Sequence, residues 1–413
     1  MKIAVFGGSF DPVHFGHLRV VRGIVESGYD KVIVVPAFVS PFKSTSGTAN
    51  VEHRDEMLRR AFMDFLFDED VDLRAIADFI RAGNLIISDV EIKRQGISYT
   101  YETIKWLKKE YPDAIFDFVI GWDCVLSLDG WKNFDKLKDL TGFLAVKRGQ
   151  MNICQSGTID RSSLTYVHLT IKIEELKSKG ANIQVVDFEA PDISSSYVRV
   201  LNAFGRIAEA VPQSVAEYIR ENKLYREYGY IAKRHAESGL SKERTEHSLR
   251  VAEESINLAK INGVNINDAI TAALLHDIAK NVEWSEMADS QYLSVEDTEL
   301  IDKLPESCRH AWIGAWAVEK IMGLSTEIAG AVRLHTTGAP NMSTLAKIIY
   351  LADYIEKGRR LKYLQSVRKI VYNDLDEGMR VVLGLMLGYL EKKGGTICDL
   401  TKEAYKYYSE NKA

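Results

Sequence analysis

The sequence is poor in the features that mark several large classes of protein. Its 413 residues include only four cysteines, Cys124, Cys154, Cys308 and Cys398, which lie far apart and form no C-x-x-C pair. This spacing argues against a disulfide framework and a cysteine zinc site, and it indicates reduced thiols in a cytoplasmic protein. No apolar stretch is long enough to span a membrane, and the apolar run 3–6 is too short for a signal peptide.

An excess of basic residues is also missing. The formal net charge at pH 7 is −5, whereas proteins that bind nucleic acid generally carry a strong positive excess. We therefore expect no nucleic-acid partner and no membrane. The hydrophobic content of 46% is that of an ordinary globular protein, and the length predicts more than one domain.

The first half of the chain alternates between strand-like and helix-like segments. Runs rich in Val and Ile that alternate with amphipathic helices predict an α/β doubly wound parallel sheet of the Rossmann-like kind, which binds ligands beyond the carboxyl ends of its strands. After about residue 225 the apolar pattern has the helical period throughout. We expect an α/β domain over 1–225 and an all-α domain over 226–413. The expected strands are 2–6, 31–35, 84–88, 116–120, 143–147 and 183–187.

A dense polar motif, GGSFDPVHFGH at 7–17, follows the first expected strand directly. Its glycines let the backbone approach a phosphate, and the start of the next helix favours anions. His14 and His17 can donate hydrogen bonds to phosphate oxygens and to a departing pyrophosphate. A single histidine there would more often be a helix cap, but the whole string favours a phosphate site over a structural turn.

This motif resembles the signature of the nucleotidyltransferase superfamily of the α/β phosphodiesterase type, and ISSSYVR at 193–199 is similar to its second signature. The resemblance implies that both segments bind ATP, with Arg199 clamping the β- and γ-phosphates. The ATP-binding residues that it implies are Gly7, Gly8, Ser9, Phe10, His14, His17, Gly121, Asp123, Ser194, Ser195, Ser196 and Arg199.

Longer strings narrow the resemblance. VVPAFVSPFK, EHRDEML, ISYTYETIKWLKKEYP and FVIGWDCVLSLDGWKNFDKL together resemble bacterial nicotinate-nucleotide adenylyltransferases. This implies nicotinate mononucleotide as the acceptor, with its phosphate on Lys43 and its pyridine ring and carboxylate among Tyr99, Thr100 and Trp131. Phe42 and Trp122 depart from the family pattern, so nicotinamide mononucleotide or a phosphopantetheine-type phosphate stays open as the acceptor.

The reaction that the resemblance implies is a direct in-line transfer of adenylyl from ATP, which yields nicotinate adenine dinucleotide and pyrophosphate. Positioning and charge neutralisation supply most of the acceleration in such a transfer, and no covalent nucleophile is needed. His14, His17, Arg199 and a Mg²⁺ ion that arrives with ATP would stabilise the developing charge. For Asp11 we expect a role in stabilising the turn or in supporting these residues.

The helical half places several histidines and aspartates where the helical period predicts apolar residues. Burying an aspartate beside a histidine in ALLHDIAK is costly unless something compensates it, and a metal ion would do so. A nitrogen and oxygen ligand set favours iron or manganese, with cobalt and zinc as alternatives. We interpret His235 as a structural or surface residue. His53 and His168 have no metal-site context, and His53 in EHR is a candidate for the lining of the acceptor pocket. The expected metal ligands are His247, His276, Asp277, His310, His335 and Asp353.

The order H…HD…D is similar to that of the HD-domain phosphohydrolases. LLHDIAK and HTTGAPNMSTLAKIIYLADYIEKGR resemble the bacterial members that cleave diadenosine tetraphosphate symmetrically to ADP. The resemblance implies hydrolysis at the metal centre with Asp277 as a catalytic residue. One alternative stays open, in which the HD half binds nucleotides and regulates or dimerises without hydrolysing anything. Assembly of the chain as a homo-oligomer also stays open. The phosphate contacts that we expect are Thr336, Thr337, Lys280, Arg359 and Arg360.

Overall fold

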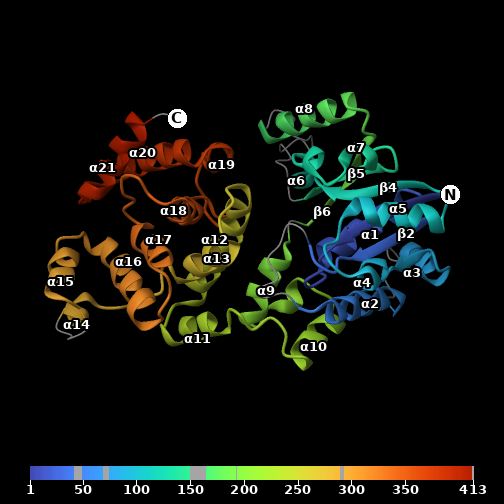
Figure 1. Cartoon of the computed structure of the whole chain (residues 1–413). Helices are drawn as coiled ribbons and strands as arrows, with labels where there is room; N and C mark the ends of the chain where they lie inside the picture. The colour runs from blue at the N-terminus through green and yellow to red at the C-terminus, as the bar shows by residue number, and fades with distance from the viewer. Residues whose placement is uncertain (41–48, 68–73, 149–163, 192, 289–292, 412–413) are drawn as a thin grey trace. The chain divides into compact units, whose positions relative to one another are not determined.

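The structure is a computed structural model of the chain, and it describes residues 1–40, 49–67, 74–148, 164–191, 193–288 and 293–411 (Figure 1). The chain divides into two compact units, Met1–Glu227 and Tyr228–Ala413. Among the described residues, no helix is both long and apolar enough to cross a membrane.

The first unit is built on one parallel sheet, which confirms the fold class expected for this half. Its strand order is β3-β2-β1-β4-β5-β6, so the order reverses between β1 and β4. Val5 of β1 pairs with Ile33 of β2 on one side and with Phe118 of β4 on the other. The strands are β1 Lys2–Gly8, β2 Lys31–Pro36, β3 Leu85–Ile87, β4 Ile115–Gly121, β5 Gly142–Arg148 and β6 Ile183–Ala190.

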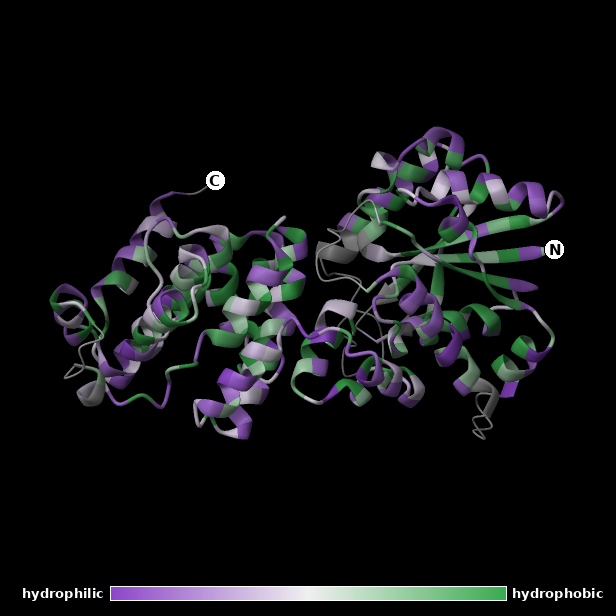
Figure 2. Ribbon diagram, turned by 60° about the horizontal axis from the view of Figure 1, so that its bottom comes forward, coloured by the Kyte–Doolittle hydropathy of each residue, from purple (hydrophilic) through white to green (hydrophobic). Residues whose placement is uncertain are grey.

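Successive strand residues point to opposite faces, and each face is covered by its own helices. In β1, Ala4 and Phe6 belong to one buried cluster, and Ile3 and Val5 belong to the other. Figure 2 shows the strands coloured hydrophobic over most of their length, as sheets buried on both faces require. The first face is covered by α1 Phe15–Glu26, α2 Val51–Phe67, α3 Arg74–Arg81, α9 Ser195–Ala203 and α10 Gln213–Glu221, with η3 Ile207–Glu209 beside them; the second by α4 Val90–Arg94, α5 Thr100–Glu110, α6 Trp122–Val125, η2 Leu128–Gly130, α7 Phe134–Leu137 and α8 Leu164–Ser178.

Helix α1, which follows the polar motif, begins and ends as its sequence predicts. His14 is the residue before its first turn, and its backbone N–H donates to Nδ1 of His17 over 3.3 Å. At the other end Gly28 has a φ of +77°, a left-handed conformation that glycine adopts without strain.

The described residues of the second unit form helices and no strand, as expected. Ser343 caps α18 by accepting a hydrogen bond from the backbone N–H of Ala346, which confirms the helix start predicted there. The elements are α11 Gly229–Glu237, α12 Lys242–Ile261, α13 Ile266–Leu275, α14 Trp284–Ala288, α15 Val295–Asp302, α16 Glu306–Trp316, η4 Ala317–Ile321, α17 Thr326–Leu334, α18 Thr344–Ile355, α19 Leu364–Asn373, α20 Leu375–Lys393 and α21 Asp399–Glu410.

His235 on α11 is part of the interior of this unit, in agreement with its interpretation as a structural residue. Its side chain is buried, and Nε2–H donates a hydrogen bond to the backbone carbonyl of Leu274. Burial lowers the pKa of His235 below its ordinary value, although the bond to Leu274 and the charge of Asp277 act in the opposite direction. The folded chain therefore holds this imidazole neutral at pH values where the unfolded chain protonates it.

This difference predicts a pH dependence of stability. Because the folded pKa lies below the unfolded one, the contribution of His235 is present above the unfolded pKa of about 6.5 and is lost as the pH falls below it. In a His235→Gln variant, which keeps a donor for Leu274, the melting temperature of the helical unit should fall by a few degrees less than that of the wild type between pH 7.5 and 5.5. Thermal unfolding followed by circular dichroism measures this. The exposed His168 of α8 supplies the control, since His168→Gln should follow the wild type, and equal slopes for all three chains would contradict the prediction.

Candidate active sites in the two units

The polar motif lies at the point where the strand order of the sheet reverses. It follows the carboxyl end of β1, and Gly121 and Trp122 stand at the carboxyl end of the neighbouring β4. In parallel sheets the loops diverge at such a point and leave a crevice that ligands occupy. The fold thus places the two loops at the position where a ligand is expected.

The glycines of the motif are explained by close packing. A Cβ atom on Gly7 would lie 2.9 Å from Cζ of Phe118, and one on Gly8 would lie 3.0 Å from Cζ of Phe10. A Cβ atom on Gly16 would lie 3.0 Å from the ring of His14 and 3.2 Å from the carbonyl oxygen of Pro191. A side chain at any of these positions would displace a ring or the backbone. The packing of the protein's own residues therefore favours glycine here, independently of any ligand.

The two histidines of the motif lie together at the start of α1. His14 is 3% exposed, and its ring stacks on that of His17 with 3.7 Å between the ring centroids. The ring of Phe10 packs edge-on against His17 at 4.9 Å. The N-terminus of a helix attracts anions through its free N–H groups and its dipole, so both imidazoles stand beside a favourable anion position.

The second motif, ISSSYVR, packs directly against the first. Ser194 caps α9 by accepting a hydrogen bond from the backbone N–H of Tyr197 over 3.2 Å. Ser195 donates to the carbonyl oxygen of Pro12 over 3.0 Å, and Nη1 of Arg199 donates to the carbonyl oxygen of Asp11 over 2.9 Å. Two segments nearly two hundred residues apart in the sequence therefore meet, and α1 and α9 both begin beside the loop.

The Asp11 carboxylate is buried and joins three parts of the unit. It accepts hydrogen bonds from the backbone N–H of Ala49 over 3.0 Å and from the hydroxyl of Tyr225 over 2.7 Å. Burial and the neighbouring Asp11 raise the pKa of Tyr225 well above 10, so the phenol keeps its proton and donates. Nη1 of Arg199 lies 3.7 Å from Asp11 Oδ2, and its Nε lies 2.9 Å from Glu227 Oε1. This geometry agrees with the supporting role expected for Asp11.

Sequence reasoning did not single out Arg54, Tyr225 or Glu227, although all three hold this loop. Arg54 is 5% exposed and donates to the carbonyl oxygens of Ser9 over 2.7 Å, Phe38 over 3.0 Å and Ala49 over 3.1 Å. No local pattern marks these residues, because each acts on a loop that is distant in the sequence.

Three of the residues expected to hold the acceptor, Tyr99, Thr100 and Trp131, belong to or directly flank the elements that cover the second face of the sheet. Tyr99 directly precedes α5, Thr100 is the first residue of that helix, and Nζ of Lys132 lies 3.9 Å from the Tyr99 ring centroid. The ring of Trp131 packs edge-on at 6.1 Å against Phe118, the same ring that closes the space beside Gly7. Lys43, Phe42 and the side chain of Asp123 lie outside the described residues.

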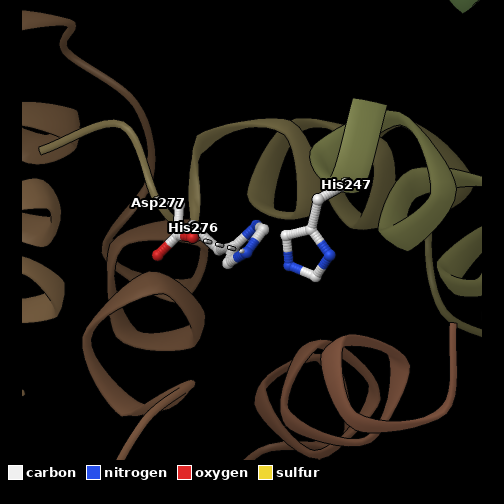
Figure 3. A group of neighbouring side chains, drawn as sticks. All are labelled: His247, His276 and Asp277. Atoms are coloured by element: carbon white, nitrogen blue, oxygen red, sulfur yellow. Dashed lines mark ion pairs between the residues drawn. The ribbon is translucent and has the colours of Figure 1, made fainter. Parts of the chain in front are cut away.

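In the second unit, all six residues expected as metal ligands come together. They form three overlapping groups in which the ligand atoms of each group lie within 4.8 Å of one another (three of the residues are drawn in Figure 3). The groups are His247 with His276 and Asp277, His276 with His335 and Asp353, and Asp277 with His310 and His335.

Two of these histidines are positioned by the same local device. His276 and His335 each follow the last residue of a helix, α13 and α17, where the final carbonyl groups have no partner within the helix. The Nδ1–H of His276 donates to the carbonyl oxygen of Ala273, and that of His335 to the carbonyl oxygen of Val332, both over 2.7 Å. With the proton on Nδ1, each ring presents the Nε2 lone pair to the cluster.

Asp277 lies beside two of the histidines of the cluster, His310 and His335. Its Oδ1 atom is 3.0 Å from Nε2 of His310 and 3.6 Å from Nε2 of His335, and Nη1 of Arg244 donates to Oδ2 over 2.8 Å. Burial by itself raises the pKa of Asp277, but His276, His310 and His335 outweigh it and hold that pKa far below its ordinary value. The carboxylate is therefore ionised at any physiological pH.

His247 on α12 is held between two carboxylates. Its Nε2 atom lies 3.0 Å from Oδ1 of Asp353, and its Nδ1–H donates to Oε1 of Glu356 over 3.2 Å. Burial by itself lowers the pKa of His247, but the bonds to Asp353 and Glu356 outweigh it and raise that pKa to about 9. A cation at Nε2 would take the place of a proton there.

The cluster fits a divalent metal ion. Nε2 of His276 is buried, lies 3.7 Å from Asp277 Oδ2 and has no hydrogen-bond partner among the described residues (Figure 3). Burial also lowers the pKa of His276 to about 4, which keeps the lone pair free for a ligand bond at neutral pH. Four imidazoles and two carboxylates without a thiolate suit iron, manganese, cobalt or zinc.

Three charged residues around this cluster were not predicted from the sequence: Arg244, Arg250 and Glu356. Arg244 and Arg250 precede and follow His247 by three residues, which places them on one face of α12 with it. Glu356 follows Asp353 by three residues at the end of α18. The spacing of three was a signal for both arginines, but it does not reveal which carboxylate each would meet.

In comparisons with known proteins, a different family model matches each of the two units. A family model described as cytidylyltransferase-like matches residues 5–201, and the HD domain model matches residues 244–358. A probable nicotinate-nucleotide adenylyltransferase of Hydrogenobaculum sp. (strain Y04AAS1) is 34% identical over 193 residues, which cover 46% of this chain and 92% of the relative.

One further relative matches most of the chain. A Mycoplasma genitalium protein named probable nicotinate-nucleotide adenylyltransferase/Ap4A hydrolase is 26% identical over 364 residues, 87% of this chain and 88% of the relative. The crystal structure of a predicted HD superfamily hydrolase involved in NAD metabolism from Clostridium acetobutylicum is 31% identical and covers 45% of this chain and 98% of its own, with a TM-score of 0.39.

The first unit thus has the parallel sheet and the two motifs at its carboxyl edge, and the second has the helices and the clustered histidines and aspartates of an HD domain. The chain belongs to the nicotinate-nucleotide adenylyltransferase family through its first unit, and its second unit carries an HD domain.

Proposed function

We propose that the chain is a cytoplasmic enzyme with two activities, one in each of two domains, 1–225 and 226–413. The first transfers adenylyl from ATP to nicotinate mononucleotide and releases pyrophosphate. The second is a metal-dependent phosphohydrolase that cleaves diadenosine tetraphosphate symmetrically to ADP.

The observation that carries the first activity is the junction of the two motifs. Ser195 and Arg199 bond to the backbone of Pro12 and Asp11, so the start of α9 lies beside the loop that leads to α1. In this arrangement His14 and His17 would donate to phosphate oxygens from one helix start, and Arg199 would bind them from the other. The identity with the Hydrogenobaculum relative supports nicotinate mononucleotide as the acceptor.

The acceptor is tested by measuring pyrophosphate release from ATP with nicotinate mononucleotide and nicotinamide mononucleotide side by side. We expect a clear preference in kcat/KM for the nicotinate form, and replacing Trp131 with Ala should reduce it. Equal turnover of the two mononucleotides, or activity with phosphopantetheine alone, would replace the acceptor but not the adenylyl transfer.

The role of Arg199 predicts a large loss of rate. Arg199→Ala should lower kcat about 10²- to 10³-fold, because a preorganised charged donor to the phosphates is lost. Arg199→Lys should recover part of the rate, since it keeps the charge without the planar fork. The matched control is Arg206→Ala, which removes a nearby arginine that pairs with Glu209. A wild-type kcat in a folded Arg199→Ala protein would be evidence against this role.

The observation that carries the second activity is the gathering of all six expected ligands, His247, His276, Asp277, His310, His335 and Asp353, into one cluster. A divalent ion held there would supply Lewis acidity, which polarises a phosphoryl group and lowers the pKa of water. The name of the Mycoplasma relative supports diadenosine tetraphosphate as the substrate.

Three cationic side chains around the cluster favour a polyanionic substrate over the alternative of a purely regulatory module. Arg244 and Lys280 lie 2.8 Å and 3.5 Å from Asp277 oxygens, and Arg359 bonds to the side chain and the backbone carbonyl of Asp353. All three are partly exposed, so they can also meet a phosphate chain. The positions of Lys280 and Arg359 beside Asp277 and Asp353 support the expectation that these two residues contact phosphate.

Metal removal and ligand replacement test this activity in the intact chain. Wild-type protein treated with a chelator should lose the hydrolysis of diadenosine tetraphosphate to ADP, and Fe²⁺, Mn²⁺ or Co²⁺ should restore it. A His276→Ala, Asp277→Ala double variant should stay at least 10³-fold less active with every metal, while its adenylyl transfer is unchanged. If wild type and double variant are equally inactive over all metals, the regulatory alternative takes the place of the hydrolase.

A further inference from the structure

Glu356 is a buried carboxylate that the proposed chemistry does not use directly. It directly follows the last residue of α18, and it is 1% exposed. Its Oε2 atom accepts hydrogen bonds from Nε of Arg250 over 2.6 Å and from the backbone N–H of Gly358 over 2.5 Å. Burying a charge costs free energy unless it is paired, and at this oxygen the guanidinium of Arg250 and the N–H of Gly358 compensate the charge.

The other oxygen of this carboxylate faces His247. Oε1 accepts from Nδ1–H of His247 over 3.2 Å, and the Nε2 atom of the same ring points to Asp353 in the ligand cluster. In His276 and His335, by contrast, Nδ1–H donates to a neutral backbone carbonyl oxygen. His247 is therefore the histidine of the cluster whose Nδ1–H is shown to meet a charged acceptor, which makes an imidazole a stronger ligand.

Gly358 leaves room for the guanidinium of Arg250 because it has no side chain. A Cβ atom at position 358 would lie 2.4 Å from Nε and 2.6 Å from Cζ of Arg250. Any other residue would push the guanidinium away from Glu356. The stretch E-K-G at 356–358 thus supplies both the acceptor and the space for the arginine that holds it.

We propose that Glu356, held by Arg250 and the N–H of Gly358, is the positioning residue that fixes the orientation and the tautomer of His247 for metal binding. This inference rests on the proposed metal-dependent function of the second unit. Glu356 touches neither substrate nor metal in this role and acts through His247. Its Oε1 atom also lies 3.9 Å from Nε of Arg359.

The test uses the full chain and Co²⁺ as the probe, with its Kd from competition against a chelator and its absorption spectrum as a report on the ligands. Glu356→Gln keeps an acceptor oxygen and loses the charge, and Glu356→Ala loses both. The Kd for Co²⁺ should rise about 10- to 100-fold in the two variants, more in the second, with an altered spectrum. Gly358→Ala, which leaves Glu356 in place, should give a smaller rise in Kd.

The chain contains a matched control. Glu254 on α12 is also buried, bonded to Arg368 over 2.5 Å and to the hydroxyl of Tyr372 over 2.6 Å. Glu254→Gln should lower the melting temperature but leave the Kd and the spectrum of Co²⁺ at wild-type values. In a His247→Gln background, Glu356→Gln should add little further loss, because the two residues act as one unit.

The outcomes separate the two levels of the proposal. If wild-type protein binds no Co²⁺, the metal-dependent function itself fails. If wild type binds and Glu356→Ala binds equally well with the same spectrum, the function stands and the role of Glu356 is overturned. Equal effects of Glu254→Gln and Glu356→Gln on the Kd would also overturn it, since they would reflect general destabilisation. Should Glu356→Ala not fold, Glu356→Gln and Gly358→Ala decide the same question.

Discussion

One buried carboxylate organises the site of the first unit. The Asp11 side chain binds the backbone of Ala49 and the hydroxyl of Tyr225, and its backbone carbonyl binds Arg199. A buried charge without partners would cost several kcal/mol, so these contacts must form together if the unit is to fold. The loop with the histidines and the start of α9 are thereby fixed before any substrate arrives, which is the preorganisation that adenylyl transfer by positioning requires.

The second unit applies the same constraint to a larger set of charges. Each of three carboxylates at its ligand cluster has an arginine partner: Asp277 has Arg244, Asp353 has Arg359 and Glu356 has Arg250. Histidines such as His310 compensate the same charges. Asp277 and Glu356 are buried, so the loss of any partner would leave an uncompensated charge in the interior. The polar residues that interrupt the apolar pattern of the helices in this unit are therefore as necessary to the packing as they are to the proposed chemistry.

Sequence patterns were sufficient to predict the sheet and the helices and to single out six residues that the structure brings into one cluster, because each of these features depends on local periodicity or on a short motif. Gly28 and Ser343 could be placed at helix ends for the same reason. Arg54, Tyr225 and Glu356 could not be found in this way, since their partners are set by the tertiary fold. The glycines of the first motif could be recognised but not explained: the reason for Gly7 is the ring of Phe118, on another strand. Local patterns predict which groups are candidates for the chemistry, and the tertiary fold determines which residues position those groups.

The expected ligands of the second unit lie on α12, α16 and α18 or directly after α13 and α17. An ion bound to all of them would be a cross-link between segments that are far apart along the chain. Its binding free energy would then count toward the folding of the whole helical unit. The concentration of available metal would consequently affect the resistance of this unit to proteolysis as well as its rate of hydrolysis. The first unit lacks these ligands, so its stability would not depend on the metal.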